Sequence, residues 1–304
     1  MIQKRKVTES VSPSKKISKA LVTTIVMISI LFGMSATAAD WSDTSIAWRY
    51  GTQFAEPFET NDITKHIASL THVSGYKYGT NFFNVDMLYS DKKDPSAIGS
   101  SNGAQEIYIV YRNTVDLGKA TGSDFKFGPA KGLGITFGFD TNTKTDTGYN
   151  SKKIMLVAGP TLMLDVPGFL NISLLEAWES NAPSGWNFGT SSTYSVDRYN
   201  YSPHPMLALA WGIPFGTSAF SFEGFMNYIV SKGKDEFGNE TKPETLFDGQ
   251  IMADIGMLTG GPKGVFKAGF EYQYWMNKFG NDASGPAGSG AFARTPMVRA
   301  EYHF

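Results

Sequence analysis

The stretch "PMVRAEYHF" (residues 296–304) alternates without interruption between two kinds of side chain. Val298, Ala300, Tyr302 and Phe304 are apolar or small, and the residues between them are polar. A period of two places the two kinds on opposite faces of a β-strand. The stretch therefore predicts a strand with one apolar and one polar face.

Eleven further stretches alternate in a similar way, so the sequence predicts twelve strands in all. Segments rich in Gly, Asn, Asp, Ser and Pro separate them, as is usual between strands. Several exceed the five or six residues typical of soluble strands, and about 9–11 tilted residues cross a bilayer. The predicted strands are 44–54, 63–73, 80–90, 105–116, 133–141, 153–165, 169–180, 201–212, 220–231, 245–258, 266–276 and 296–304.

The connections between these strands alternate between short and long. Short ones include "SGYKYG" (74–79) and "VPG" (166–168), whereas the segments 91–104, 181–200 and 277–295 are long and polar. This asymmetry, with an even number of strands, predicts an all-β fold: a single transmembrane antiparallel β-barrel with short periplasmic turns and long extracellular loops. Two connections depart from the pattern. Segment 55–62 is rather short for the end with long loops, and segment 117–132 is long for the end with short turns.

A barrel that spans hydrocarbon must close, because every backbone N–H and C=O needs a partner within the protein. We therefore expect residues 296–304 to pair with 44–54. A soluble β-sandwich is the main structural alternative, but its strands are usually shorter and lack this loop asymmetry. A β-helix would show short internal repeats, which this sequence lacks. Pro160 lies inside a predicted strand, where we expect a bulge.

The polar faces of the predicted strands supply candidate pore-lining residues. An Arg or Lys facing lipid at mid-depth costs about 2–4 kcal/mol, which favours placing charges inside. Small barrels have a packed interior and large ones a wide aqueous channel. Twelve strands enclose an interior of intermediate width, in which small solutes touch the wall. We expect the lining to include Arg49, Asp86, Arg112, Asp140, Glu223, Asp248, Asp254, Glu271, Arg299 and Glu301, with Gln53, Asn84, Asn227, Gln250, Gln273 and His303 beside them.

The first 39 residues have the features of a cleaved secretory signal peptide. Six basic residues precede the apolar run "ALVTTIVMISILFGM" (20–34), and Ala36-Thr37-Ala38 forms an A-x-A site. The run is shorter than the about 20 residues of a membrane-spanning helix, which makes an uncleaved anchor the weaker alternative. We expect export through the periplasm, a barrel over residues 40–304, and a location in the outer membrane of a Gram-negative cell.

Composition narrows the possible partners. Removing the signal takes 6 of 27 basic residues and 1 of 28 acidic ones, which leaves 21 and 27 and a net charge of about −6. An acidic chain is a poor partner for nucleic acid, and its charge predicts a slight preference for cations in a pore. The sequence has no cysteine, which excludes disulfides and thiolate metal ligands.

The stretch "RNTVDLGKATGSDFKFGPAKG" (112–132) carries the most specific pattern in the sequence. Its order of residues resembles an element of the nucleoside-specific channel-forming porin family of the outer membrane (Tsx, also called OmpK). The matching positions are Arg112, Asp116, Thr121, Gly122, Asp124, Phe127, Gly128 and Pro129. The signal peptide, the mature length, the twelve strands, the hairpin "LMLDVPGFLNISL" (162–174) and the final "YHF" are also similar.

The resemblance implies a passive channel for nucleosides with no cofactor and no enzymatic activity. It also implies contact with outer-membrane lipid and lipopolysaccharide, insertion by the barrel-assembly machinery, and a phage receptor role in some members. Only Arg112 and Asp116 carry over as candidate functional residues, and Asp116 has a second interpretation as a turn cap. Phe304 after strict alternation resembles the sorting signal of outer-membrane barrels.

Other functions have weaker support in the sequence. "GSSNG" (99–103) fits the G-x-S-x-G motif of hydrolases, but it lies in a polar loop and not on a strand-to-helix turn. His66 and His72 are about 20 Å apart on one strand, too far to share a metal, and "DEFGNE" (235–240) departs from the EF-hand spacing. A general small-solute porin and a non-conducting receptor or adhesin barrel remain as alternatives to a nucleoside channel.

Overall fold

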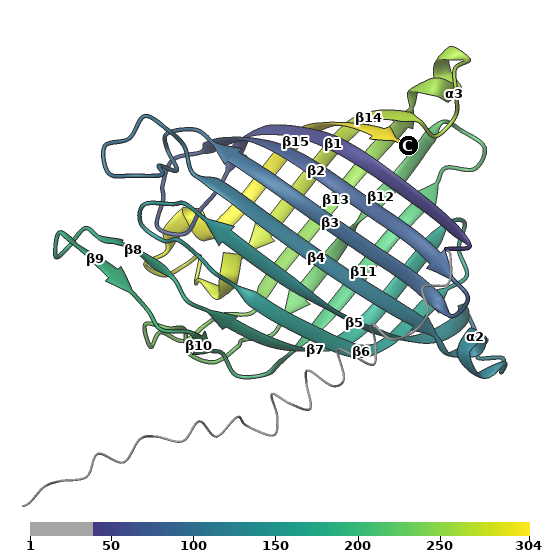
Figure 1. Cartoon of the computed structure of the whole chain (residues 1–304), viewed down its shortest axis with the longest axis horizontal. Helices are drawn as coiled ribbons and strands as arrows, with labels where there is room; N and C mark the ends of the chain where they lie inside the picture. Colours follow the sequence, from purple (N-terminus) through teal and green to yellow (C-terminus); the bar gives the residue numbers. More distant parts are fainter. Residues whose placement is uncertain (1–38) are drawn as a thin grey trace, which may run out of the picture. The chain divides into compact units, whose positions relative to one another are not determined.

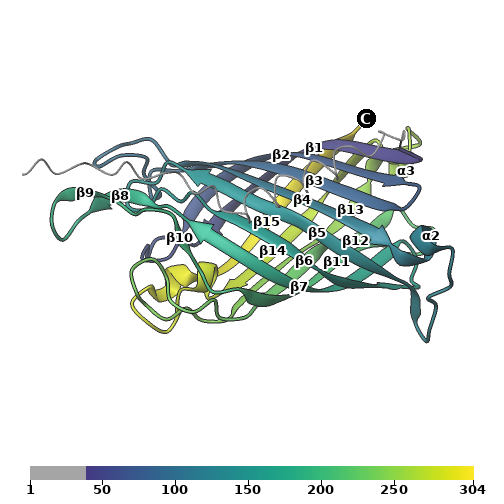
Figure 2. The same ribbon diagram turned by 60° about the horizontal axis from the view of Figure 1, so that its bottom comes forward.

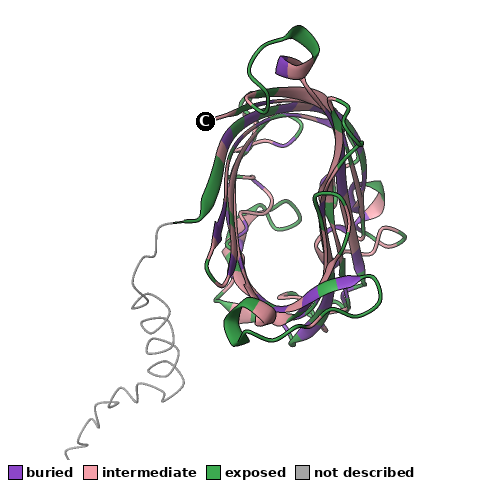
Figure 3. Ribbon diagram, turned by 90° about the vertical axis from the view of Figure 1, so that its right-hand side faces the viewer, coloured by how far each residue is buried: buried purple, intermediate pink, exposed green. Residues whose placement is uncertain are grey.

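The computed structural model describes residues 39–304, so the predicted signal peptide lies, except for residue 39, outside the described residues. In the described part, twelve antiparallel strands form one closed barrel. The ring closes between the first and last strands, where Ser45 pairs with His303 and Gly51 pairs with Met297. Figure 3 shows this ring end-on as an elongated loop of ribbon. The predicted fold class and the predicted pairing of 296–304 with 44–54 are confirmed.

The barrel strands are longer than most strands of soluble proteins, as the sequence predicts. Each strand pairs with its neighbour in the chain, and the segment 182–203 between β7 and β11 holds a small hairpin and a short strand, β10, that pairs with β7. The barrel consists of β1 (Trp41–Phe54), β2 (Ile63–Tyr76), β3 (Gly79–Ser90), β4 (Gln105–Asp116), β5 (Ala130–Lys144), β6 (Ile154–Leu164), β7 (Phe169–Asn181), β11 (His204–Pro214), β12 (Phe220–Ile229), β13 (Glu244–Asp254), β14 (Phe266–Met276) and β15 (Phe292–His303).

The remaining elements lie in the connections. The hairpin in segment 182–203 is formed by β8 (Ser184–Asn187) and β9 (Ser192–Ser195), and β10 is Tyr199–Asn200. Two five-residue helices follow β4 and β13, α2 (Leu117–Thr121) and α3 (Ile255–Thr259), and two 3-10 turns follow β14, η1 (Lys278–Gly280) and η2 (Gly288–Ala291). No helix within residues 39–304 has the length and apolar character needed to cross a membrane.

The two faces of the barrel wall differ in character. At the closing pair, Ile46 and Tyr302 lie opposite each other and are 49% and 46% exposed, whereas Ala47 and Glu301, one step along, are buried. The exposed set forms a large apolar outer surface, which soluble monomers rarely show and membrane barrels require. It includes Trp48, Leu70, Ile107, Ile135, Leu156, Leu174, Leu207, Ile251, Phe270 and Val298.

The two ends of the barrel also differ. Figures 1 and 2 show α2, α3 and the C-terminus at one end and the β8–β9 hairpin at the other. The segments 77–78, 165–168 and 215–219 join strands at the first end, which we call the short-connection end. The opposite, long-connection end carries six connections: 55–62, 91–104, 145–153, 182–203, 230–243 and 277–291.

Three local predictions are wrong. The pairing of β6 with β7 skips Gly159 and Pro160 and resumes in the same register, so no bulge is needed at the proline. A bulge occurs instead between Gly51 and Phe54. It turns Phe54 inward and leaves Gln53 exposed, because one extra residue reverses the faces of a strand. The tenth strand ends at Asp254, four residues earlier than predicted, because α3 begins there.

Candidate functional site

Arg49 of β1 lies at the centre of a group of charges inside the barrel. Its Nη2 is 2.6 Å from Asp86 Oδ1 on β3, and its Nη1 is 3.1 Å from Glu271 Oε1 on β14. These contacts reach over β2 on one side and β15 on the other. Only a side chain on the enclosed face can span both, so Arg49 points into the lumen.

Arg299 of β15 lies directly opposite Arg49 in the register. Two like charges facing each other across strands destabilise a sheet unless they share a counter-charge. Glu271 supplies it, because its second oxygen accepts from Arg299 Nη1 at 2.8 Å. Arg299 Nε also donates to Glu301 Oε1 at 2.5 Å. The two arginines are thus held by alternating carboxylates along the inner wall.

The same face continues onto β12 and β13. Glu223 Oε1 accepts from Lys267 Nζ at 3.1 Å, and Asp248 Oδ2 accepts from Gln273 Nε2 at 3.1 Å. Five carboxylates and three cations make up the whole set, so the carboxylates exceed the cations by two. We call this set the charged belt: Arg49, Asp86, Glu223, Asp248, Lys267, Glu271, Arg299 and Glu301.

Arg112 and Asp140 form a separate pair on β4 and β5. Arg112 Nη1 donates to Asp140 Oδ1 at 2.5 Å, and the Tyr108 hydroxyl donates to Asp140 Oδ2 at 3.2 Å. Within residues 39–304, no salt bridge joins this pair to the charged belt. Tyr108 lies directly opposite Asp86, so the predicted pore-lining residues, apart from Asp254 at the rim, form a band from β12 through β1 to β5 and not a closed ring.

Outside this band, the inner wall is mainly apolar, with one hydroxyl pair between Thr161 and Ser173. Six residues of β6, β7, β11 and β12 pack into one buried cluster, which we call the apolar wall: Met155, Val157, Leu175, Ala177, Met206 and Ile229. Met155 pairs directly with Asp140, so the cluster shares the inward face. Sequence reasoning assigned only polar faces to the interior and missed this wall. The strand "IMLVAGPTLML" (154–164) is largely apolar on both faces, so its sequence does not show which face is enclosed.

Two further lining residues were missed, although both follow the period of two. Phe225 lies opposite Asp248, and Phe82 lies opposite Arg112, so both rings are on the inward face. They are 39% and 38% exposed, in contrast to the buried apolar wall. Accessible aromatic rings therefore lie beside charged groups in both parts of the lumen.

The residues of the motif at 116–129 lie at the short-connection end. Asp116 caps α2 by accepting from the Lys119 N–H at 3.1 Å, and Gly122 ends the helix with a φ of 72°. Glycine suits that left-handed conformation because it has no Cβ. Gly128 also has a positive φ, and Phe127 is exposed in the turn that leads to β5. Of the motif residues carried over, only Arg112 lies on the inner wall.

Asp254 differs from the other predicted pore-lining residues. It lies at the end of β13 and caps α3, accepting from the Met257 N–H at 3.1 Å and from the Gly264 N–H at 2.7 Å. Backbone donors occupy its carboxylate at the barrel rim. The register places Asp254 opposite Lys267 at the last position of the inward face, so it lies at the rim of the lumen and not along its wall.

At the long-connection end, a buried group of charges ties several connections together. Glu56 of segment 55–62 lies 2.5 Å from Lys65 Nζ and 3.1 Å from Lys278 Nζ of segment 277–291. Asp94 of segment 91–104 lies 3.0 Å from Lys144 Nζ, which also lies 3.6 Å from Glu56. We call these five residues, with Asp146, the mouth cluster.

Protonation states within the mouth cluster differ. Burial alone would raise the pKa of Glu56, but the ammonium groups of Lys144, Lys278 and Lys65 hold it well below its usual range. Burial raises the pKa of Asp146 to about 7, and the neighbouring Asp94 carboxyl adds to the shift. Asp146 is thus the member of the cluster that titrates near neutral pH.

A second contact joins connections that are not neighbours around the ring. Glu236 of segment 230–243 accepts hydrogen bonds from the hydroxyls of Tyr149 and Tyr201, the latter at 2.5 Å. The ring of Phe237 packs edge-on against Tyr149 and Tyr194, with centroids 6.4 and 5.9 Å away. The "DEFGNE" segment is therefore occupied with holding the loop, and no cluster of metal-ligating side chains occurs within the described residues.

Comparisons with known proteins show a similar architecture at low identity. The sequence matches no family model and no curated protein. Among solved structures, the translocator domain of the autotransporter NalP from Neisseria meningitidis is 12% identical, with a TM-score of 0.43 over 94% of this chain and 96% of that one. The KdgM porin (11%, TM-score 0.39) and the NanC porin (10%, TM-score 0.37) each align over 86% of this chain and 99% of their own. At these TM-scores the likeness carries no argument about what this chain does.

Proposed function

We propose that this chain forms an outer-membrane channel for the passive passage of small polar solutes, with nucleosides as the preferred class. The observation that carries the proposal is the closed barrel with an apolar outer surface and the charged belt on its inner wall. A bilayer-spanning sheet with charges on one face is stable when it closes with that face inside, away from lipid. An enclosed polar wall is in turn what a hydrophilic solute needs in order to pass.

The preference for nucleosides is supported by the arrangement of rings and charges. A nucleoside has a flat base and a hydroxylated sugar, and base stacking on an aromatic ring is worth about 1–3 kcal/mol in nucleic-acid complexes. Phe225 offers an accessible ring directly opposite Asp248, and the partly exposed carboxylate of Glu223, two residues along the same face, can accept from a ribose hydroxyl. The likeness of residues 112–129 to the nucleoside-specific family points the same way.

Liposome swelling tests this preference. Purified protein in vesicles should admit adenosine and thymidine faster than sugars of similar size. Phe225→Ala should slow the nucleosides about fivefold or more and leave the sugars unchanged, because only the bases lose a stacking surface. Phe270→Ala is the matched control, since Phe270 is 74% exposed on the outer face. Equal rates for nucleosides and sugars in the unaltered protein would overturn the nucleoside preference.

A general pore with a preference for cations is the second candidate function, favoured by the excess of carboxylates in the charged belt. Fixed negative charge on a narrow wall raises the local concentration of cations. Planar bilayers with a salt gradient should give reversal potentials that favour potassium over chloride. Arg49→Gln removes a belt cation and should shift the reversal potential further toward the potassium value. Absence of discrete current steps would instead favour a non-conducting receptor barrel.

A further inference from the structure

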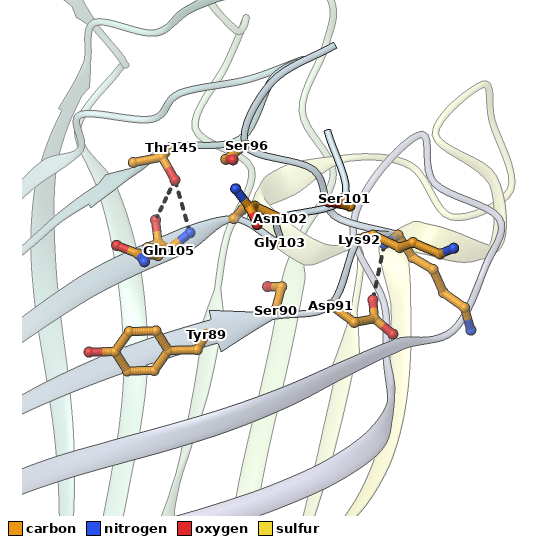
Figure 4. Close-up of a pocket in the computed structure, with 12 residues that line it drawn as sticks. Tyr89, Ser90, Asp91, Lys92, Ser96, Ser101, Asn102, Gly103, Gln105 and Thr145 are labelled. Atoms are coloured by element: carbon orange, nitrogen blue, oxygen red, sulfur yellow. Dashed lines mark hydrogen bonds between the residues drawn. The ribbon is translucent and has the colours of Figure 1, made fainter. Parts of the chain in front are cut away.

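A groove lies on the outer surface of the barrel where β3 and β4 reach the long-connection end. It has a volume of about 980 Å³. Figure 4 shows it between the end of β3 and the connection 91–104. Lys92 and Lys93 line one part together with Asp91, whose carboxylate accepts from the Lys93 N–H, and hydroxyl and amide groups that include those of Ser101, Asn102 and Gln105 line much of the rest.

The register places this groove on the membrane side of the wall. Tyr89 and Gln105 pair across β3 and β4, and the next residue inward along β3, Leu88, packs against the buried cluster inside the barrel. Successive residues of a strand face opposite ways, so Tyr89 and Gln105 face outward. Tyr89 is 46% exposed. An outward tyrosine at a strand end is typical of the boundary between hydrocarbon and headgroups.

Lys92 and Lys93 have no carboxylate partner, unlike two other lysines of the long-connection end. Lys234 lies 4.0 Å from Glu240, and Lys242 lies 3.5 Å from Asp282. In the part of the chain that the structure describes, neither Lys92 nor Lys93 lies within 4.0 Å of a carboxylate. Two exposed, consecutive lysines therefore follow the outward Tyr89 by three and four residues.

The segment that carries these lysines is held firmly. The Asp91 N–H donates to the Thr64 carbonyl at 2.9 Å, and Asp94, two residues beyond Lys92, is buried in the mouth cluster. The Lys93 Nζ donates to the Asp62 carbonyl at 2.7 Å, and its backbone N–H donates to Asp91 Oδ1 at 3.1 Å. The Lys93 ammonium is thus held in place, and a fixed cation loses less conformational entropy on binding an anion than a mobile one.

We propose that this groove binds the phosphorylated sugar headgroup of an outer-leaflet glycolipid. The proposal rests on the proposed function only for the outer-membrane location of the barrel. Lysine binds phosphate as a point charge, and hydroxyl and amide groups suit a sugar ring. The groove lies at the depth at which such headgroups meet the protein, with Tyr89 beneath it to contact the first acyl carbons. Charge complementarity thus favours an anionic glycolipid over a neutral phospholipid.

Native mass spectrometry of the full barrel in detergent, with EDTA present, tests this proposal. The probes are purified bis-phosphorylated lipid A, the same lipid after enzymatic removal of both phosphates, and inorganic phosphate. We expect lipid A to bind, and the double variant Lys92→Gln/Lys93→Gln to weaken it by about fivefold per lysine removed. Lys234→Gln/Lys242→Gln is the matched control and should bind as the unaltered barrel does.

Three results would overturn the proposal: equal binding of dephosphorylated lipid A, equal loss in the control variant, or full competition by inorganic phosphate at the concentration of the lipid. Planar-bilayer currents distinguish failure of lipid binding at the groove from failure of the channel function. The Lys92→Gln/Lys93→Gln variant should conduct as the unaltered protein does, because neither side chain faces the lumen. A barrel that conducts but does not distinguish the lipids refutes the groove alone.

Discussion

Strands β13, β14, β15, β1 and β3 carry most of the charged belt, whereas β6, β7, β11 and β12 carry the apolar wall, although one continuous ladder joins them all. The charged side is held by salt bridges such as Arg49–Glu271, and the apolar side by packing around Met206. The same backbone geometry thus supports two kinds of interior. The comparison shows that charge pairs hold one side of the lumen, whereas the other side combines an apolar cluster with hydrogen-bonded hydroxyls and the buried carboxylate of Glu179.

Removing the carboxylate shared by the two arginines should have the largest effect on stability. Glu271→Gln leaves Arg49 and Arg299 opposite each other with no charge between them, and breaking a buried pair costs about 3 kcal/mol. Urea titration of the barrel in vesicles, followed by gel mobility without heating, measures the loss. Glu223→Gln is the control and should cost under about 1 kcal/mol, because its pair with Lys267 is partly exposed. Equal losses would show that the charged belt is not coupled through Glu271.

Truncation of the apolar wall should be the next largest effect. Met206→Ala opens a cavity in a cluster where Met206 is 1% exposed, and such truncations cost about 2 kcal/mol or more. Leu207→Ala, one residue along on the outer face, should cost less because lipid tails fill the space. The same urea titration compares them. A larger loss for Leu207→Ala would mean that the inward side of these strands is not packed.

A change in pH should alter the free energy of local opening at the mouth cluster by on the order of 1 kcal/mol. The pKa of Asp146 is about 7, above the ordinary aspartate value, so the folded state binds more protons between the two values. Stability contributed here is therefore greatest at low pH and falls as pH rises through about 7. Hydrogen exchange in segment 145–153 should quicken from pH 5 to pH 8 after correction for the intrinsic rate, and Asp146→Asn should remove the change.

Asp282 provides the control for that pH dependence. Hydrogen bonds from Ser284 lower the pKa of this exposed carboxyl, so its contribution is present at neutral pH and is lost only in acid. Asp282→Asn should leave the change between pH 5 and pH 8 in segment 145–153 as it is. If both variants flatten the profile, then the pH dependence comes from a general loosening of the loops and not from Asp146.

Much of the fold follows from the sequence, because a strand with one lipid face and one lumen face must alternate. All twelve barrel strands, the closure of 296–304 on 44–54 and the inward position of Arg49 and Glu271 follow from that period. The apolar wall does not follow from it, since a strand apolar on both faces gives no sign of which side is enclosed. The bulge between Gly51 and Phe54 was missed, although an isolated glycine inside a strand often marks one.

Disruption of the cap at Asp116 should have the smallest effect on stability. It also tests most directly whether the motif at 116–129 affects the solute. Asp116→Ala removes one hydrogen bond to the Lys119 N–H in an exposed five-residue helix, which is worth about 0.5–1 kcal/mol. Asp254→Ala at the matching cap of α3 should cost about as much, and neither should alter nucleoside swelling rates, since both caps lie at the short-connection end. If Asp116→Ala alone slows nucleosides while sugars pass as before, then the motif acts on the solute and the turn is part of the pore. Equal, small effects would mean that residues 116–129 are a structural element of the turn, and the nucleoside preference would then rest on Phe225 and Glu223.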